Sequence, residues 1–254
     1  MKLLIFLGIL LASLAGQSLA QAPAQISVSP DVFRIDIDDN RPHSLTVMNL
    51  SDRTIEATTS VSGWTLENDQ VVPTPPTPAS LDQWIILNPV DMKIAPGESQ
   101  IVRFAIRPSS EPKRGEHSAM LWIQEKHAMA PSRMVKARFR IGVAIYADKN
   151  PVERAGQFIA AHIEPDKNRL KLEFSNQGNA HDRPSGTVTL ENRNNQQQAP
   201  ITLSLPKRPI LPGKKASQYV LLPTLPTGTY LLTLEGHFYD RQRVFQQQME
   251  FRAP

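Results

Sequence analysis

The longest alternating stretch of the chain reads Arg133-Met134-Val135-Lys136-Ala137-Arg138-Phe139-Arg140-Ile141-Gly142-Val143-Ala144-Ile145-Tyr146. Apolar residues fill every second position from Val135 to Ile145, and the positions between them are largely basic as far as Arg140. Successive side chains of a β-strand point to opposite faces, so this pattern predicts a long strand with one apolar and one basic face. The stretch lies near the middle of the chain, where we expect the first of two domains to end.

Around this stretch, the chain consists of short runs of β-branched and aromatic residues separated by turns such as Ala95-Pro96-Gly97-Glu98. Closely spaced strands, with 22 prolines against 12 glycines, are typical of immunoglobulin-like β-sandwiches. We expect an all-β protein with two such domains, residues 24–148 and 149–254, divided at Asp148-Lys149-Asn150-Pro151. The proline-rich run 71–78 is expected to be a loop, because proline cannot join the interior of a sheet.

The first twenty residues have the pattern of a secretory signal peptide. A positive charge at Lys2 precedes an apolar run, and a small-residue cleavage site ends at Ala20. We expect residues 1–20 to be removed and the protein to be exported, with an uncleaved membrane anchor as the alternative interpretation. No later segment is apolar for long enough to cross a membrane. The lack of cysteine excludes thiol catalysis and a zinc–thiolate site.

Residues of the kinds used in catalysis are present but are not arranged for it. The histidines lack the short spacing of metal ligands, and the sequence contains neither a glycine-rich phosphate loop nor a nucleophile elbow. We expect exposed or loop histidines, and we predict no enzyme, no catalytic residue, no metal and no cofactor. The six histidines are His43, His117, His127, His162, His181 and His237.

Two other groups of residues allow two interpretations each. Asp36, Asp38 and Asp39 would suit calcium, but the glycine and glutamate of a calcium loop are missing, which favours a solvated strand end. The three tryptophans would suit a sugar-binding surface, although burial as sandwich anchors is commoner; they are Trp64, Trp84 and Trp122. The mild net charge of +4, without a basic block, indicates no nucleic-acid partner.

A long strand at the edge of a sheet offers unpaired amide and carbonyl groups to a partner's strand. Lys136, Arg138 and Arg140 give this strand a basic face, which could bind carboxylates through charge-assisted hydrogen bonds. The alternative is that these residues only keep the edge soluble, since basic side chains commonly protect sheet edges.

The order of features resembles the periplasmic chaperones of pilus assembly, the PapD-like superfamily. The most specific similarity is the Pro96-Gly97 turn followed by an alternating strand that carries Arg103. The segments 26–30, 44–50, 119–125 and 138–146 are similar to the family's first, second, penultimate and last strands of the first domain. The resemblance covers most of the chain and implies two sandwiches that meet at an angle.

In that family the last strand of the first domain is lent to a pilin that lacks one strand of its own. The resemblance implies that this chain stabilises pilin-like subunits in the periplasm and passes them to an outer-membrane usher, without a cofactor. A basic pair in the interdomain cleft holds the subunit's carboxylate, for which Arg34 and Arg140 are the nearest candidates. The implied donor strand contains Met134, Val135, Lys136, Ala137, Arg138, Phe139 and Ile141.

The sequence allows either of the two alternating sets of side chains on the donor strand to face outward. If Met134, Lys136 and Arg138 face outward, charges enter an apolar groove, which is costly unless they are paired. If Val135, Ala137, Phe139 and Ile141 face outward, strand donation works but the core of the chaperone loses these side chains. The alternative function is an envelope binding or structural protein of the same fold, which engages an acidic partner through the basic face.

Overall fold

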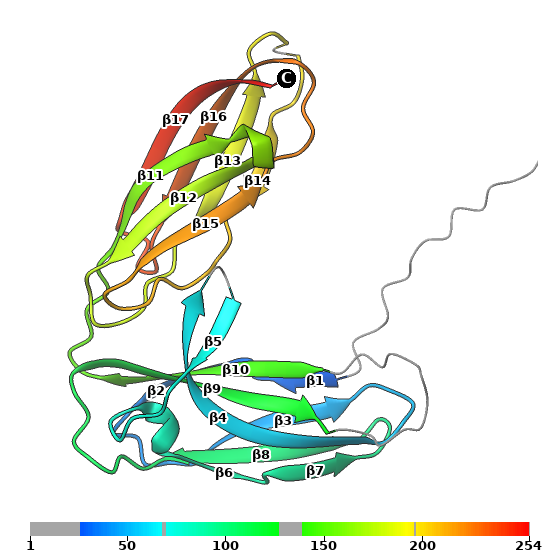
Figure 1. The fold of residues 1–254 in the computed structure, drawn as a ribbon, viewed down its shortest axis with the longest axis vertical. Helices are drawn as coiled ribbons and strands as arrows, with labels where there is room; N and C mark the ends of the chain where they lie inside the picture. The colour runs from blue at the N-terminus through cyan, green and yellow to red at the C-terminus, as the bar shows by residue number, and fades with distance from the viewer. Residues whose placement is uncertain (1–25, 68–69, 127–138, 196, 254) are drawn as a thin grey trace, which may run out of the picture.

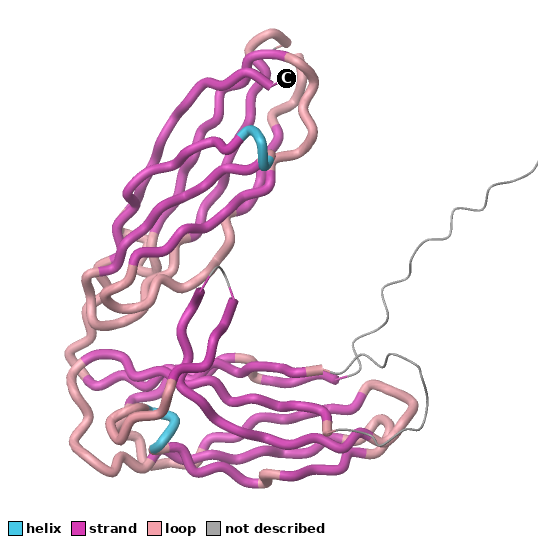
Figure 2. Tube along the Cα trace, in the orientation of Figure 1, coloured by secondary structure: helices cyan, strands magenta, loops and turns pink. Residues whose placement is uncertain are grey.

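The computed structural model describes residues 26–67, 70–126, 139–195 and 197–253. Within these ranges the regular structure is almost entirely strand, with two short 3-10 turns, η1 (Leu81–Gln83) and η2 (Pro165–Lys167) (Figure 2). None of the helices in this part of the chain is long and apolar enough to cross a membrane. The predicted signal peptide and the donor residues Met134, Val135, Lys136, Ala137 and Arg138 lie outside the described residues.

The first half of the described chain forms two facing sheets. One has the strand order β1-β3-β8-β6, and the other has the order β2-β10-β9-β4-β5, with β7 paired to β4. These are the A-B-E-D and G-F-C orders of an immunoglobulin sandwich, with β2 running parallel to β10. The strands are β1 (Ile26–Ser29), β2 (Val32–Asp36), β3 (His43–Asn49), β4 (Ile55–Glu67), β5 (Gln70–Thr74), β6 (Ile85–Asn88), β7 (Asp91–Ile94), β8 (Ser99–Ile106), β9 (Gly115–Glu125) and β10 (Arg140–Lys149).

The second half repeats the sandwich with fewer strands, and it stands at an angle on one end of the first (Figure 1). Its sheets have the orders β11-β12-β15 and β14-β13-β16-β17, all antiparallel. The expected class, an all-β protein of two immunoglobulin-like sandwiches, is confirmed. The strands are β11 (Gly156–Glu164), β12 (Arg169–Asn176), β13 (Ser185–Asn192), β14 (Ile201–Ser204), β15 (Lys215–Leu221), β16 (Gly228–His237) and β17 (Val244–Ala253).

Each sandwich encloses its own hydrophobic core. In β10, apolar side chains alternate with other side chains, and the apolar ones face the first core. Val143 and Ile145 are fully buried there, while Phe139 and Ile141 are partly buried at its border. The apolar face of the described part of this strand therefore points inward. The other face, which includes Tyr146, points out of the sandwich towards the second domain.

The hairpin of β4 and β5 corrects one sequence expectation. The whole proline-rich run 71–78 is expected to be loop, yet its residues 71–74 belong to β5, which pairs with β4 and places Pro73 opposite Trp64. Proline is tolerated because β5 is an edge strand with only one neighbour in the sheet. The hairpin rises from the first domain towards the second (Figure 1).

A buried asparagine closes the same turn in both domains. Asn49 ends β3 and donates from Nδ2 to the carbonyls of Arg53 and Ile94, at 2.7 and 3.0 Å. Asn176 ends β12 and donates to the carbonyls of Ala180 and Ile210, at 2.8 and 2.9 Å. Each asparagine Oδ1 also accepts the amide two residues later, at 2.9 Å. One side chain thus satisfies three backbone groups that would otherwise lack partners in the turn.

Replacing Asn49 with alanine should lower the free energy of unfolding by about 1–3 kcal/mol, because two carbonyls lose their donor. Urea unfolding of the full chain measures this difference. The matched control is Asn88→Ala, since Asn88 is exposed in β6, and its effect should stay within about 0.5 kcal/mol. An equal loss in both variants would contradict a structural role for the Asn49 side chain.

Candidate functional site

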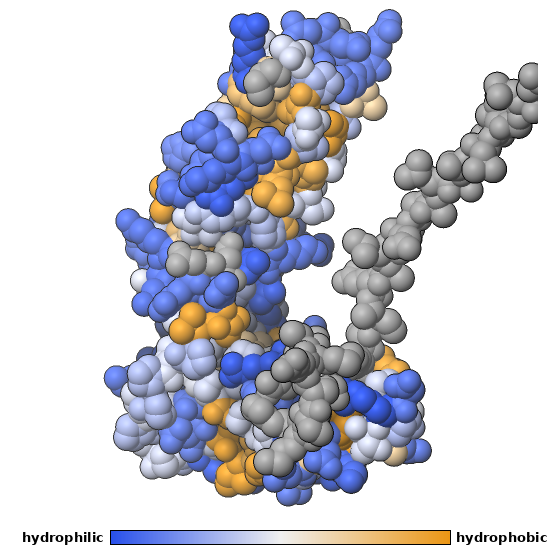
Figure 3. Space-filling model, turned by 45° about the vertical axis from the view of Figure 1, so that its right-hand side comes forward, coloured by the Kyte–Doolittle hydropathy of each residue, from blue (hydrophilic) through white to orange (hydrophobic). Residues whose placement is uncertain are grey.

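A third apolar cluster lies between the domains, outside both sandwich cores. It consists of Trp64, Met120, Trp122 and Tyr146 from the first domain, with Leu211 of the second domain packed against it. Figure 3 shows a largely hydrophilic surface with hydrophobic patches, one of them at the level where the domains meet. The expected burial of all three tryptophans is confirmed, but Trp84 alone of the three belongs to a sandwich core.

Gly142 is the position on β10 over which this cluster packs. A Cβ atom there would come within 2.8 Å of Met120 Sδ and 2.9 Å of Trp122. A larger residue would therefore push the cluster away from the sheet. Two residues earlier, the Arg140 guanidinium lies over the Trp122 ring, 3.9 Å from its centroid, a cation–π contact at an exposed position.

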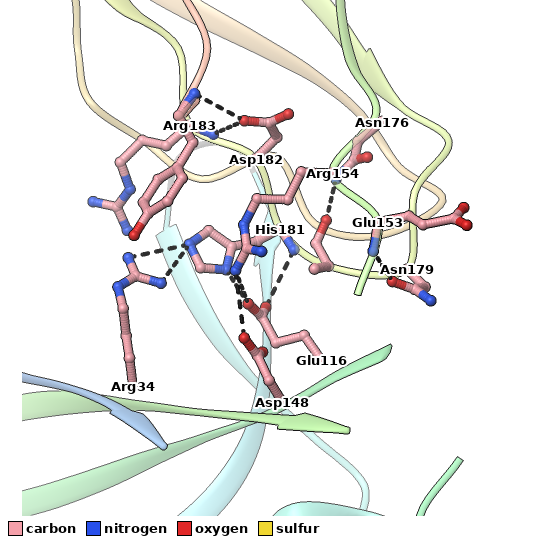
Figure 4. Close-up of polar contacts among 12 residues, drawn as sticks. Arg34, Glu116, Asp148, Glu153, Arg154, Asn176, Asn179, His181, Asp182 and Arg183 are labelled. Carbon is pink, nitrogen blue, oxygen red and sulfur yellow. Dashed lines mark hydrogen bonds and ion pairs between the residues drawn. The ribbon is translucent and has the colours of Figure 1, made fainter. Parts of the chain in front are cut away.

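Arg34 lies where the first domain faces the second. On β2 it pairs with Tyr146 of β10, so both side chains leave the same face of the sheet. The Arg34 guanidinium is 5.1 Å from the Tyr146 ring centroid and 5.2 Å from that of Tyr239. Its Nη1 and Nη2 are 3.4 and 3.5 Å from His181 Nε2 (Figure 4). Within the described ranges no carboxylate forms an ion pair with Arg34.

His181 joins the two domains through a buried hydrogen bond. Its side chain has 0% exposure, and that of Glu116 on β9 has 2%. His181 Nδ1 is 2.6 Å from Glu116 Oε2, and the His181 amide donates to Glu116 Oε1 at 3.2 Å. A guanidinium can only donate, so Nε2 accepts from Arg34 and the ring carries its proton on Nδ1. The ring stacks on Tyr146 at 4.1 Å.

A backbone contact beside this pair brings the domains even closer. The Glu116 amide donates to the carbonyl of Asn179 at 2.8 Å. Gly115 precedes it with a φ of +116°, and a Cβ atom at that position would lie 2.8 Å from the same carbonyl. Glycine is required here by both the backbone conformation and the close approach.

The second-domain side of the site is organised by Asp182, which is fully buried. Its Oδ1 accepts the amides of Arg183 and Tyr239, and its Oδ2 accepts the amide of Gly156 at 3.0 Å. The Arg243 guanidinium neutralises the carboxylate at 2.8 Å. A single carboxylate therefore ties three loops together and fixes the neighbouring His181.

Arg154 is a second arginine of the cleft, and no sequence pattern indicated it. Its Nη2 is 3.5 Å from Glu116 Oε2 and 3.7 Å from Asp148 Oδ2, and its guanidinium lies 5.0 Å from the Tyr239 ring centroid. Tyr239 is 48% exposed, with Arg34 and Arg154 both in contact with its ring. The exposed part of the cleft is thus an aromatic ring beside two guanidinium groups.

Two acidic groups of the cleft have shifted pKa values. Burial raises the pKa of Asp148 above the usual aspartate range, and the charge of Glu116 adds to this effect, while Arg154 opposes it. Burial likewise raises the pKa of Tyr146. Ionisation of these two side chains is therefore unfavourable, because they lie where water is largely excluded.

The structure brings one of the two predicted anchor residues into the cleft. Arg34 lies opposite Tyr146, whereas Arg140 lies six positions earlier on β10. At roughly 3.3 Å per residue, the two arginines are about 20 Å apart along the sheet. One carboxylate cannot contact both of them.

His181 meets the expectation of an exposed or loop histidine only in its location. It does lie in a loop, between β12 and β13, but it is fully buried. Its partners come from β2 and β9, so no local spacing could have identified it. Asp38 pairs with Lys149 and Asp39 with Arg41 at the end of β2. The described residues contain no group of three or more histidine, aspartate or glutamate side chains placed to hold a metal.

Comparisons with known proteins identify the fold. No family model and no curated protein matches the sequence. Among solved structures, the YadV chaperone matches with a TM-score of 0.51 and 10% identity, over 90% of this chain and 100% of that one. A chain of a chaperone–tip adhesin complex studied in CFA/I fimbriae biogenesis matches with a TM-score of 0.50 and 10% identity, over 89% and 98%. The fold is that of the PapD-like chaperones, as the sequence resemblance predicts.

Asp148→Asn should stabilise the protein increasingly as the pH rises above about 4, the usual pKa of an aspartate. A raised pKa in the folded state means that ionisation of Asp148 opposes folding, and asparagine removes this effect. Urea unfolding at several pH values measures it.

Asp39→Asn is the matched control with the opposite sign, because a hydrogen bond from Arg41 lowers the pKa of Asp39 to about 2. This variant should be less stable than the wild type at pH 7 and should match it when the pH falls towards 2. A parallel pH dependence of the two variants would contradict burial as the cause of the Asp148 shift.

Proposed function

We propose that this protein is a periplasmic chaperone that binds pilin-like subunits by lending them an edge of β10. The observation that carries the proposal is an unpaired stretch of this strand. β10 pairs with β9 along its whole length, but β2 pairs with it only from Ala144 onward. The register makes the backbone groups of Arg140 and Gly142 point away from β9. No described segment hydrogen-bonds to them there.

A subunit strand added at this edge would continue the sheet beyond β10. Backbone hydrogen bonds supply affinity in such strand addition, and alternating side chains supply specificity. Phe139 and Ile141 stand beside the open edge and are only partly buried against the first core. In the proposal they and the preceding residues 134–138 form the donor segment. Val143 and Ile145 stay in the first core, and the apolar side chains that precede them, which this core covers only in part at Phe139 and Ile141, extend into the groove of the subunit.

Arg34 is the proposed anchor for the C-terminal carboxylate of the subunit. Its guanidinium is held between two tyrosine rings and against His181, so little side-chain freedom remains to be lost on binding. Planar guanidinium groups bind carboxylates through two parallel hydrogen bonds. Arg154, on the other side of Tyr239, adds positive charge to the same opening.

The cellular setting is part of the same proposal. Residues 1–20 would direct export and be removed near Ala20, and the domains 24–148 and 149–254 would work together in the periplasm. An outer-membrane usher would receive the loaded subunit. The activity needs binding energy alone, so we propose no enzymatic step and no cofactor.

Replacing Arg34 with alanine should weaken binding of the subunit by about 1.5–3 kcal/mol, the range for hydrogen bonds to a charged group. Isothermal titration with a C-terminal peptide of the co-expressed pilin-like subunit measures this. Arg103→Ala is the control, because Arg103 is exposed on β8 of the opposite sheet. A peptide amide that binds the wild type as tightly as the free carboxylate would contradict the anchor.

Two substitutions at one position separate strand donation from charge. Arg140→Pro removes an amide that does not serve β9, so the fold should persist while the open edge is blocked. Arg140→Ala keeps the amide and removes only the guanidinium. We expect the proline variant to lose the copurified subunit and the alanine variant to retain it. Loss in the alanine variant alone would favour an acidic partner bound by the basic face.

A further inference from the structure

The second sandwich also has an open strand edge, on β15. In the sheet order β11-β12-β15 this strand has one neighbour among the described residues. The amide of Asn176 donates to the carbonyl of Lys214, and that of Leu222 donates to Asn168, which fixes the phase of the β12–β15 ladder. Backbone groups alternate in direction along an antiparallel strand. The groups that point away from β12 are those of Lys215, Ser217, Tyr219 and Leu221.

The corresponding strand of the first domain is covered. There β8 lies between β3 and β6, so both of its edges are paired. β15 occupies the same place in the second sandwich, yet no described strand takes the position of β6 there. On the opposite side of this sandwich, the Gln247 carboxamide of β17 bridges to β11, accepting from the Ala161 amide and donating to its carbonyl.

A cavity of about 650 Å³ runs along the open edge, between β15 and the hairpin of the first domain. Its volume is within the range of binding sites in proteins. Its walls come from both domains. They include Glu67 of β4, Arg169 of β12, Lys214 of the segment before β15, and Lys215, Ser217 and Tyr219 of β15.

The walls of this cavity are basic. Lys214 and Lys215 have no carboxylate partner within the described ranges, whereas Arg169 pairs with Glu164 and stacks on Tyr219 at 3.8 Å. Among the lining residues that the structure describes, Glu67 alone is acidic. Lysines at a sheet edge disfavour the pairing of a strand that brings no negative charge, because their own charge would stay unbalanced. Such an edge therefore favours an acidic strand.

Gln218 ties β15 to the segment that precedes it. Its side chain is 1% exposed, and its Nε2 donates to the carbonyl of Arg208 at 3.0 Å. That bond fixes the orientation of the amide, because a flipped group would set two oxygens against each other. Oε1 is buried without a hydrogen-bond donor in the structure. This buried carboxamide shapes the wall of the cavity and is not accessible to a ligand.

We propose that the edge of β15 binds an extended acidic peptide segment of a partner protein as an added strand. Its backbone would pair with Lys215, Ser217 and Tyr219, and its carboxylates would lie near Lys214 and Lys215. The site lies on another strand and in another domain than the proposed donor edge of β10. It does not depend on the chaperone function.

A fluorescein-labelled heptapeptide of alternating glutamate and valine, with blocked ends, is the probe. Fluorescence anisotropy with the full chain should show saturable binding, and a peptide with lysine in place of glutamate should not bind. Hydrogen exchange should slow at the amides of Ser217 and Tyr219 on binding, but not at Gln246 of β17. Absence of saturable binding by the acidic peptide would overturn the proposal.

Ser217→Pro tests the strand addition, because it removes an outward amide and leaves the ladder to β12 intact. Lys215→Glu tests the charge. Each should weaken binding at least about tenfold. The matched controls are Gln248→Pro, an outward position on the β17 edge, and Lys93→Glu, an exposed lysine of the first domain. Both should bind like the wild type.

Each pattern of results decides the proposal. Suppose that Lys215→Glu weakens binding, while a folded Ser217→Pro variant keeps wild-type affinity and wild-type protection of the Tyr219 amide. The peptide would then be held by charge attraction without strand pairing, and the proposal would be overturned. Equal weakening by Lys93→Glu would do the same. If the melting temperature shows that Ser217→Pro does not fold, the exchange of the Ser217 and Tyr219 amides in the wild type remains the deciding measurement.

Discussion

The hydrogen bond between His181 and Glu116 is the contact on which the arrangement of the two domains depends. It is fully buried, and it lies beside the backbone bond from Glu116 to Asn179. A buried carboxylate without partners is strongly unfavourable, so this joint forms as a whole or fails as a whole. Because the His181 ring also receives Arg34 and stacks on Tyr146, closing the joint builds the cleft at the same time. The angle between the domains and the position of the proposed anchor thus depend on the same contact.

β10 contributes to the core and also carries the proposed binding edge, because its two faces and its edge meet different surroundings. Val143 and Ile145 fill the first core, and Gly142 and Tyr146 carry the interdomain cluster on the other face. The edge is covered by β2 only from Ala144 onward. A strand held so firmly on two faces can offer its remaining edge without losing its own conformation. This preorganisation lowers the entropy lost when a partner strand is added.

Much of the fold could be predicted from the sequence, because alternation along a strand is a local signal. The two sandwiches and the importance of β10 follow from period-two patterns and turn residues. The cleft could be predicted only in part. Arg34 was found through the resemblance, whereas His181 and Arg154 take their roles from partners on distant strands. The pairing of Pro73 in β5 was missed since an edge strand tolerates a residue that a central strand excludes.

The edges of the sheets show which surfaces the fold leaves open. In the first domain, β6 covers β8, and in the second, Gln247 bridges β17 to β11. Among the open edges of the described sheets, the start of β10 and the outer side of β15 both carry basic residues, Arg140 at one and Lys215 at the other. Positive charge on an open edge prevents pairing between copies of the same chain, since like charges would meet. The same charge leaves the edge accessible to an acidic or apolar strand of another protein, so protection against aggregation and selectivity for partners arise from the same side chains.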